Sequence, residues 1–228
     1  MFRPLQRKYV LPQDLQIMKK VVLLFVLVIS CSLSLTAQEA GNDAEKKGES
    51  RFWGESSIGM VRINTPLFAD TEGNTYLSGQ FSSGISILIM RELPKTKFSL
   101  GGSLWYNHLD TRLQNPTFIA SRFLIGPAAA FKTPFKEKGD FYITAKAGLK
   151  WDIHRNELPS GYLFCQNPLS LGGSLSVAYA FRSRNAILNG MGIKGTIYSY
   201  GNSREARNAH IKDPFVDCWE VSFIFYHR

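Results

Sequence analysis

Residues 140–153 read DFYITAKAGLKWDI, and every second side chain in this stretch is apolar. The apolar positions run from Phe141 to Trp151, whereas the positions from Tyr142 to Asp152 carry hydroxyl, amine or carboxylate groups or are glycine. A period of two residues is typical of a β-strand whose two faces meet different surroundings. This stretch therefore predicts a strand, and residues 168–182 repeat the same alternation.

Similar segments recur along most of the chain and predict eight strands. The predicted strands are residues 55–64, 75–91, 97–108, 122–132, 140–153, 168–182, 187–200 and 217–228. The connections between them alternate between long ones, of about 10, 13, 14 and 16 residues, and short ones, of about 5, 7 and 4 residues. This alternation is typical of bacterial outer-membrane barrels, so we expect an all-β fold, an eight-stranded antiparallel up-and-down transmembrane β-barrel preceded by a signal peptide.

Alternation alone does not decide which face of each strand points into the barrel. A soluble barrel of the lipocalin type has the same period, with its apolar side turned inward. In residues 168–182, however, the polar face consists of small residues from Ser170 to Ala180 and carries no charge. A wall in contact with water would carry long charged side chains, whereas small residues fit a narrow interior. We therefore expect the apolar faces to point outward, toward lipid.

Aromatic residues gather near the ends of the predicted strands. Outer-membrane barrels carry such residues at both membrane interfaces, so we expect two girdles on the outer surface. The expected members are Trp53, Phe98, Tyr106, Phe123, Phe131, Phe141, Trp151, Phe181, Tyr200 and Trp219.

The predicted strand at residues 122–132 contains Pro127 and three alanines. Proline has no amide hydrogen to donate to a neighbouring strand, and a closed barrel has no free edge where this loss would be harmless. We therefore expect a bulge or a local break in the pairing there.

The last predicted strand alternates aromatic and apolar residues, from Trp219 to Phe225, with residues from Glu220 to Tyr226. Here the chain resembles the small OmpA/OmpX-type outer-membrane barrels, which close with an aromatic-rich C-terminal strand. The family commonly ends on an aromatic residue, whereas this chain ends His227-Arg228. The resemblance covers about residues 52–228 and implies that the long loops are outside the cell and both termini periplasmic.

The chain begins with features of an export signal. Met18-Lys19-Lys20 and the apolar run that follows, with small residues before Gln38, predict a signal peptide that starts at Met18, and that run is too short to span a bilayer. We expect residues 1–37 to be a cleaved leader, 38–51 a flexible periplasmic tail and 52–228 the barrel. Alternatively, the run that ends at Cys31 resembles a lipobox, in which this cysteine would be acylated.

The formal net charge is +9, from 27 basic and 18 acidic residues. Removal of the expected leader leaves 22 basic and 17 acidic residues, or +5. A modest basic excess suits a surface beside anionic lipid, and charges scattered among loops are not typical of nucleic-acid binding. We expect outer-membrane lipid and lipopolysaccharide as partners, and no nucleic acid.

Two cysteines remain after the leader, Cys165 and Cys218. Each lies next to the start of a predicted strand, at the same end of the barrel. In an oxidising compartment they could form a disulfide, or both could remain free thiols.

The interior of an eight-stranded barrel is just wide enough for its own side chains, so we expect a polar network rather than an open channel. Arg62 and Glu220 would be neighbours where the first and last strands meet, and could form an ion pair. Alternatively, these charges reach solvent at the rim. The other expected members of the network are Lys146, Lys150, Asp152 and Lys194.

Three histidines fall in or beside different long connections. Together with two aspartates they could in principle bind a metal, but no paired spacing supports such a site, so we expect no metal and no cofactor. The residues are His108, His154, His210, Asp110 and Asp213.

An acyl hydrolase would need a serine or water beside a histidine and an acid. No serine lies two residues from a histidine, and G-x-S-x-G does not occur. We therefore expect a non-enzymatic outer-membrane protein of a Gram-negative bacterium, whose loops serve recognition of an extracellular ligand or surface partner, or envelope structure. The alternatives are a lipid-modifying acyl hydrolase and a soluble or lipid-anchored, lipocalin-like ligand-binding barrel.

The longest predicted loop, residues 201–216, is the first candidate for recognition, because loops carry function when the wall and the lumen are occupied. Its charged and titratable residues are Arg204, Glu205, Arg207, His210, Lys212 and Asp213.

Overall fold

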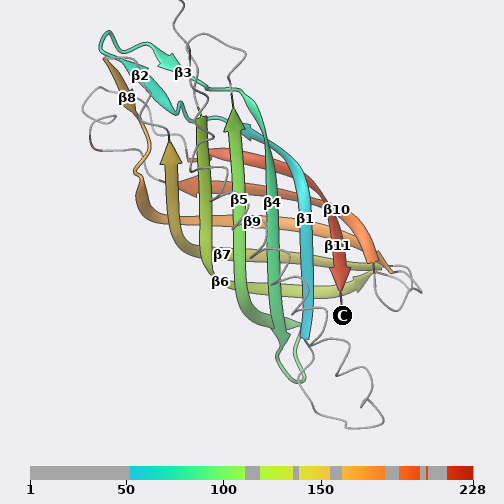
Figure 1. Cartoon of the computed structure of the whole chain (residues 1–228). Coiled ribbons are helices and arrows are strands. Elements are labelled where there is room, and N and C mark those ends of the chain that lie inside the picture. Colours follow the sequence, from blue (N-terminus) through green and yellow to red (C-terminus); the bar gives the residue numbers. More distant parts are fainter. Residues whose placement is uncertain are drawn as a thin grey trace, which may run out of the picture. The chain divides into compact units, whose positions relative to one another are not determined.

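The computed structural model describes residues 52–110, 119–135, 139–154, 161–182, 190–200, 204 and 215–227. Eight long strands close an antiparallel barrel in the order β1-β11-β10-β9-β7-β6-β5-β4 (Figure 1). Each strand pairs with the long strands before and after it in the chain, and β1 pairs with β11, so the prediction of an up-and-down eight-stranded barrel is confirmed. The bounds are β1 Phe52–Ile63, β4 Phe81–Glu92, β5 Phe98–Asp110, β6 Ile119–Phe135, β7 Gly139–His154, β9 Leu169–Arg182, β10 Gly190–Tyr200 and β11 Cys218–His227.

The two ends of the barrel carry different connections. Residues 64–80, 111–118, 155–168 and 201–217 connect strands at one end, which we call the long-connection rim, and residues 93–97, 136–138 and 183–189 connect them at the other, the short-turn rim. Because β6 begins at Ile119, the connection after β5 is shorter than the sequence predicted. No helix in the described part of the chain is both apolar and long enough to cross a membrane.

A small second sheet, which the sequence analysis did not predict, lies at the long-connection rim. It consists of β2 (Phe68–Asp70), β3 (Thr75–Tyr76) and β8 (Tyr162–Phe164), in the order β3-β2-β8. Figure 1 shows it at the end of the barrel opposite the C-terminus. Phe68 and Phe164 of this sheet pack in one cluster with Ile63 of β1 and Leu109 of β5, so the sheet is held against the ends of the barrel strands.

The outward faces of the barrel strands are apolar. Leu171 is 80% exposed and Phe223 is 68% exposed, although burial of each would be worth about 2 kcal/mol in water. Among the described strand residues, the charged side chains at outward positions lie only near strand ends: Arg62, Arg91 and Asp110. The prediction that the apolar faces point outward is therefore confirmed, and the inward apolar face of a lipocalin-like barrel is wrong for this chain.

The lumen is filled by side chains in layers. An apolar cluster that includes Trp53, Met90, Tyr142 and Tyr226 lies toward the short-turn rim. A second cluster around Trp105, Tyr198 and Tyr200 lies closer to the long-connection rim, and polar side chains occupy the wall between the two.

Two residues of the expected aromatic girdles are inside the barrel. Trp53 is 1% exposed and Tyr200 is 5% exposed, whereas Phe98, Trp151 and Phe181 are more than half exposed on the outer face. Both residues lie near a strand end, but the alternation puts Trp53 in line with the inward Glu55 and Ser57, so the prediction that it belongs to a girdle is wrong. The same holds for Tyr200, which shares the buried face of β10 with Tyr198.

The expected disturbance at Pro127 is a local break rather than a bulge. Strand β6 pairs with β7 up to Ile125 and again from Ala128, without a change of register, and pairing is lost only across Gly126 and Pro127. On its other side β6 continues to pair with β5 through Gly102↔Pro127.

Candidate functional site

The best-connected buried charges lie in the lumen, where four strands meet around Glu55 of β1. Its carboxylate accepts hydrogen bonds from the Lys194 ammonium of β10 and from the Tyr142 hydroxyl of β7, the latter at 2.5 Å. The Lys194 Nζ also donates to Ser57 Oγ and Ser86 Oγ, each at 2.9 Å. All these side chains are buried. Every donor of the ammonium thus has an acceptor, which is the condition under which a buried ion pair is tolerated.

Glu220 of β11 is buried higher in the lumen, but its partner is not Arg62. The Glu220 Oε2 accepts hydrogen bonds from Trp105 Nε1 and the Tyr198 hydroxyl, each at 2.8 Å. The register pairs Val61 with Glu220 and Arg62 with Trp219, so Arg62 points outward and is exposed. The expected Arg62–Glu220 ion pair is therefore wrong, since a shift of one residue moves a side chain to the other face of the sheet.

A third polar group lies nearer the long-connection rim. The Lys150 Nζ donates to Asp152 Oδ2 at 2.6 Å, and the two side chains are fully buried. Arg122 of β6 donates from Nε to Asn107 Oδ1 at 3.0 Å, and its guanidinium lies 5.7 Å from the centre of the Trp105 ring. Arg122, Asn107 and Glu55 were not predicted as members of the network, although the alternation puts all three at inward positions.

Lys146 lies on the inner wall between these groups and is only 5% exposed. Its ammonium has no hydrogen-bond partner among the described residues, and the same holds for the Glu220 Oε1. The hydroxyls of Thr144, Ser174, Thr196 and Ser222, on neighbouring strands, are also unpartnered within the described part of the chain. Buried polar atoms normally bind protein or ordered water, so this wall is suited to hold water. The structure thus places Lys146, Lys150, Asp152, Lys194 and Glu220 inside the barrel, but in separate groups.

A serine and a histidine meet on the outer face near the long-connection rim. His108 of β5 is opposite Ser121 of β6, and its Nδ1 lies 3.0 Å from Ser121 Oγ. The Tyr106 hydroxyl lies 3.4 Å from the same oxygen, and Asp110 follows on the same face of β5. This pair was not predicted from the sequence, because the two residues are 13 positions apart and only the strand register brings them together.

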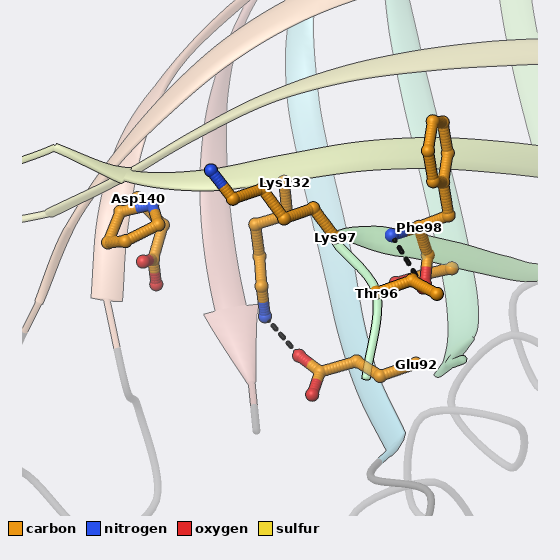
Figure 2. A pocket seen from close by; sticks show the side chains of 8 residues that line it. Glu92, Thr96, Lys97, Phe98, Lys132 and Asp140 are labelled. Carbon is orange, nitrogen blue, oxygen red and sulfur yellow. Dashed lines mark hydrogen bonds and ion pairs between the residues drawn. The ribbon is translucent and has the colours of Figure 1, made fainter. Parts of the chain in front are cut away.

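A hollow of about 220 Å³ opens at the short-turn rim (Figure 2). Lys132 contacts Glu92 there, and its ammonium lies 3.1 Å from the Tyr226 hydroxyl. Ligand pockets usually enclose about 300–1,000 Å³, so this small hollow is a poor candidate for a ligand site. The lining residues are Glu92, Thr96, Lys97, Phe98, Ser99, Lys132, Pro134 and Asp140.

The turn between β2 and β3 is organised by one carboxylate. Asp70 accepts hydrogen bonds from the backbone amides of Glu72 and Asn74, at 3.0 and 2.8 Å, and from the Asn74 side chain and the Tyr76 hydroxyl, each at 2.8 Å. These bonds, that from the Asn74 side chain first, lower the pKa of Asp70, and the bond to Asp70 raises the pKa of Tyr76. The long-connection rim therefore presents an ordered turn whose residues 71–75 are exposed.

The two cysteines are buried free thiols, so the structure does not form the disulfide considered above. Cys165 packs against Ala69 near the small sheet, and burial raises its pKa to about 12. The Cys218 Sγ lies in a different cluster, 3.7 Å from the Tyr200 hydroxyl.

Several expected site residues lie outside the described part of the chain. They include Cys31, Glu205, Arg207, His210, Lys212 and Asp213, whereas Arg204 is described and exposed. Within the described residues, no group of three histidine, cysteine, aspartate or glutamate side chains could hold a metal ion. His154 stacks on Phe164, with 4.3 Å between ring centres.

Comparison with solved structures identifies the fold as that of small outer-membrane barrels. The chain is similar to Neisserial surface protein A, with a TM-score of 0.51 and 12% identity over 78% of this chain and 98% of that one. It is also similar to Ail, the attachment invasion locus protein of Yersinia pestis, solved with the heparin analogue sucrose octasulfate; the TM-score is 0.41 and the identity 10%, over 79% of this chain and 99% of that one. No family model and no curated protein matches the chain.

Proposed function

We propose that this protein is a non-enzymatic barrel of the outer membrane of a Gram-negative bacterium, with both termini in the periplasm. The observation that carries the proposal is the combination of an apolar outer face, charged only near the strand ends, with a lumen of paired and hydrogen-bonded polar groups. A water-soluble barrel would need the opposite arrangement, because exposure of so many large apolar side chains to water is unfavourable.

The long-connection rim supplies the recognition surface in this proposal. The small sheet and the turn held by Asp70 give this rim a fixed shape, and the wall below it is occupied by lipid. We assign it to an extracellular ligand or surface partner, or to envelope structure, and the exposed Arg204 lies in the connection between two strands at the same rim. The proposal includes outer-membrane lipid and lipopolysaccharide as contacts of the wall, and neither a nucleic acid nor a cofactor.

Membrane fractionation followed by gel electrophoresis tests the location and the fold. The protein should sediment with the outer membrane, require detergent for extraction, and migrate differently before and after boiling, because a membrane barrel stays folded in cold detergent. Recovery in the soluble fraction after cell lysis would contradict the proposal.

Ser121 and His108 favour a second candidate, an acyl hydrolase that acts on membrane lipid. A serine hydrogen-bonded to histidine is the start of a nucleophile and base pair, and this one faces the membrane. The reaction also needs donors for the oxyanion, and the backbone amides of β5 and β6 beside the pair belong to the strand ladder. We therefore rank this candidate second. Release of labelled fatty acid from phospholipid or lipopolysaccharide that is abolished by Ser121→Ala would reverse the ranking.

A further inference from the structure

Arg62 is a cation at the edge of the apolar outer face. Its side chain is exposed on β1, one residue before the strand ends at the long-connection rim. Among the described residues it forms neither a salt bridge nor a side-chain hydrogen bond. Its guanidinium carbon lies 5.7 Å from the centre of the Phe81 ring. A guanidinium has five donors in a planar fork that matches a phosphate, and no described residue accepts a hydrogen bond from this one.

Two aromatic rings flank Arg62. Phe81 of β4 and Trp219 of β11 are its cross-strand neighbours on either side. Their ring centres are 6.4 Å apart, at an interplanar angle of 87°. Trp and Phe at this level are suited to the boundary between acyl chains and headgroups. The group therefore presents donors toward the headgroups and apolar area toward the acyl chains.

The strand register gives the depth of this group. At the opposite end of the same strand pair, Arg91 of β4 lies over Phe52 of β1, with 5.8 Å between the guanidinium carbon and the ring centre. The register pairs Arg62 with Phe81 and Phe52 with Arg91, so the two arginines are separated by ten residues of strand. At about 3.3 Å per residue this is roughly 33 Å, or about 25 Å along the membrane normal for strands tilted by about 40°.

About 25 Å is the height of the apolar band of outer-membrane barrels, so the two arginines lie at its two edges. Between them, the outward positions of β1 and β4 carry glycine, serine, isoleucine and methionine and no charge. Arg62 thus lies at the level where lipid phosphates begin.

We propose that Arg62, flanked by Phe81 and Trp219, binds a phosphate group of the lipid that surrounds the long-connection rim, which is lipid A in an outer membrane. The guanidinium donates hydrogen bonds to the phosphate oxygens, and the two rings contact the first part of the acyl chains. This site rests on the proposed function, because it needs the barrel to span the membrane with this rim at the outer leaflet.

Native mass spectrometry of the folded full-length barrel tests the site, with bisphosphorylated lipid A added in detergent as the probe. We expect Arg62→Gln to reduce retained lipid A about three- to tenfold, and Arg62→Lys to reduce it less, since lysine keeps the charge but loses the fork. Arg91→Gln, at the other edge, is the matched control and should retain as much as the unchanged protein. Lipid A without phosphates should bind the unchanged protein and Arg62→Gln equally.

Equal retention of bisphosphorylated lipid A by the unchanged protein and Arg62→Gln would overturn the site. Complete displacement of the lipid by inorganic phosphate at equal concentration would also overturn the site, because the ligand would then be free phosphate. Only protein whose gel mobility changes on boiling is used in this comparison. A protein that fails this check does not form a membrane barrel, and that outcome contradicts the proposed function and not the lipid site alone.

Discussion

At the scale of single residues, the alternation of apolar and polar residues predicts which face of a strand a side chain lies on, but not which side chain it contacts. Lys194 and Glu220 were expected in the lumen, and both are buried there. Their partners could not be predicted, because a period of two residues gives the face of each side chain but leaves the register of two strands open by steps of two. For the same reason, Glu55 was not recognised as the partner of Lys194. The expected partner Arg62 is excluded by the alternation itself, which puts it in line with the outward Ile58 and Met60 and puts Val61 opposite Glu220.

The pair of Glu55 and Lys194 leads to a prediction for stability. Lys194→Met should lower the free energy of unfolding by about 3–5 kcal/mol, because it leaves the buried Glu55 carboxylate without its cation. Urea unfolding in detergent micelles, followed by tryptophan fluorescence, measures the change. The double variant Glu55→Leu, Lys194→Met should recover most of the loss, and a double variant as unstable as Lys194→Met would contradict this assignment.

Asp70 leads to a prediction for pH dependence. Its pKa is lowered in the folded protein, chiefly by the hydrogen bond from Asn74, so its contribution to the turn is present at neutral pH and is lost as the pH falls below about 4 and through the lowered pKa. Hydrogen exchange should show protection of the Glu72 and Asn74 amides at pH 6 and its loss near pH 2. Asp70→Asn should remove most of this pH dependence. Protection that is unchanged at pH 2 would show that another group holds the turn.

At the scale of strands, the long elements could be predicted and the short ones could not. Each of the eight barrel strands has ten or more residues, enough for the alternation to repeat several times. Strands β2, β3 and β8 have only two or three residues, and they exist because Phe68 and Phe164 pack against the barrel end. The predicted strand at residues 75–91 is in fact two elements, separated by a turn in which Leu77 and Gly79 have positive φ.

Two adjacent glycines of β5 give a matched test of strand packing. A Cβ atom on Gly101 would lie 1.9 Å from the Ile89 carbonyl oxygen of β4, whereas a Cβ on Gly102 would meet no atom within 4 Å. Gly101→Ala should therefore lower the free energy of unfolding by about 1–3 kcal/mol, and Gly102→Ala should leave it unchanged or raise it slightly. Urea unfolding in micelles distinguishes the two. Equal stability of the two variants would mean that β4 and β5 are less closely packed than the structure has them.

At the scale of the whole molecule, composition determines which side of the wall faces lipid. The alternation predicts the barrel, and the small uncharged residues opposite the leucines of β9 predict its narrow interior. Composition and alternation do not predict the arrangement of the long-connection rim, because it depends on contacts between residues far apart in the chain, such as the pairing of Phe68 with Phe164.

The filled lumen predicts that the intact barrel does not act as a porin. Trp53, Tyr142 and Tyr226 pack together across one part of the interior, and Trp105 stacks on Tyr198 at 4.3 Å in another. Planar bilayer recordings should show no steady conductance of porin size. The double variant Trp53→Ala, Tyr226→Ala removes two rings of the first cluster and serves as the comparison. Its conductance should be higher than that of the unchanged protein. A large open conductance of the unchanged protein would mean that these clusters do not close the lumen.

The pairing of β1 with β11 has a consequence for assembly in the cell. Ten residue pairs join these strands, from Gly54↔His227 to Ile63↔Cys218, and β11 is the last of the barrel strands to be synthesised. Until it arrives, β1 and β10 each keep a row of backbone amides and carbonyls without partners, and such open edges recruit other chains. We therefore expect a chain that ends before residue 218 to leave both edges open and to associate with other chains.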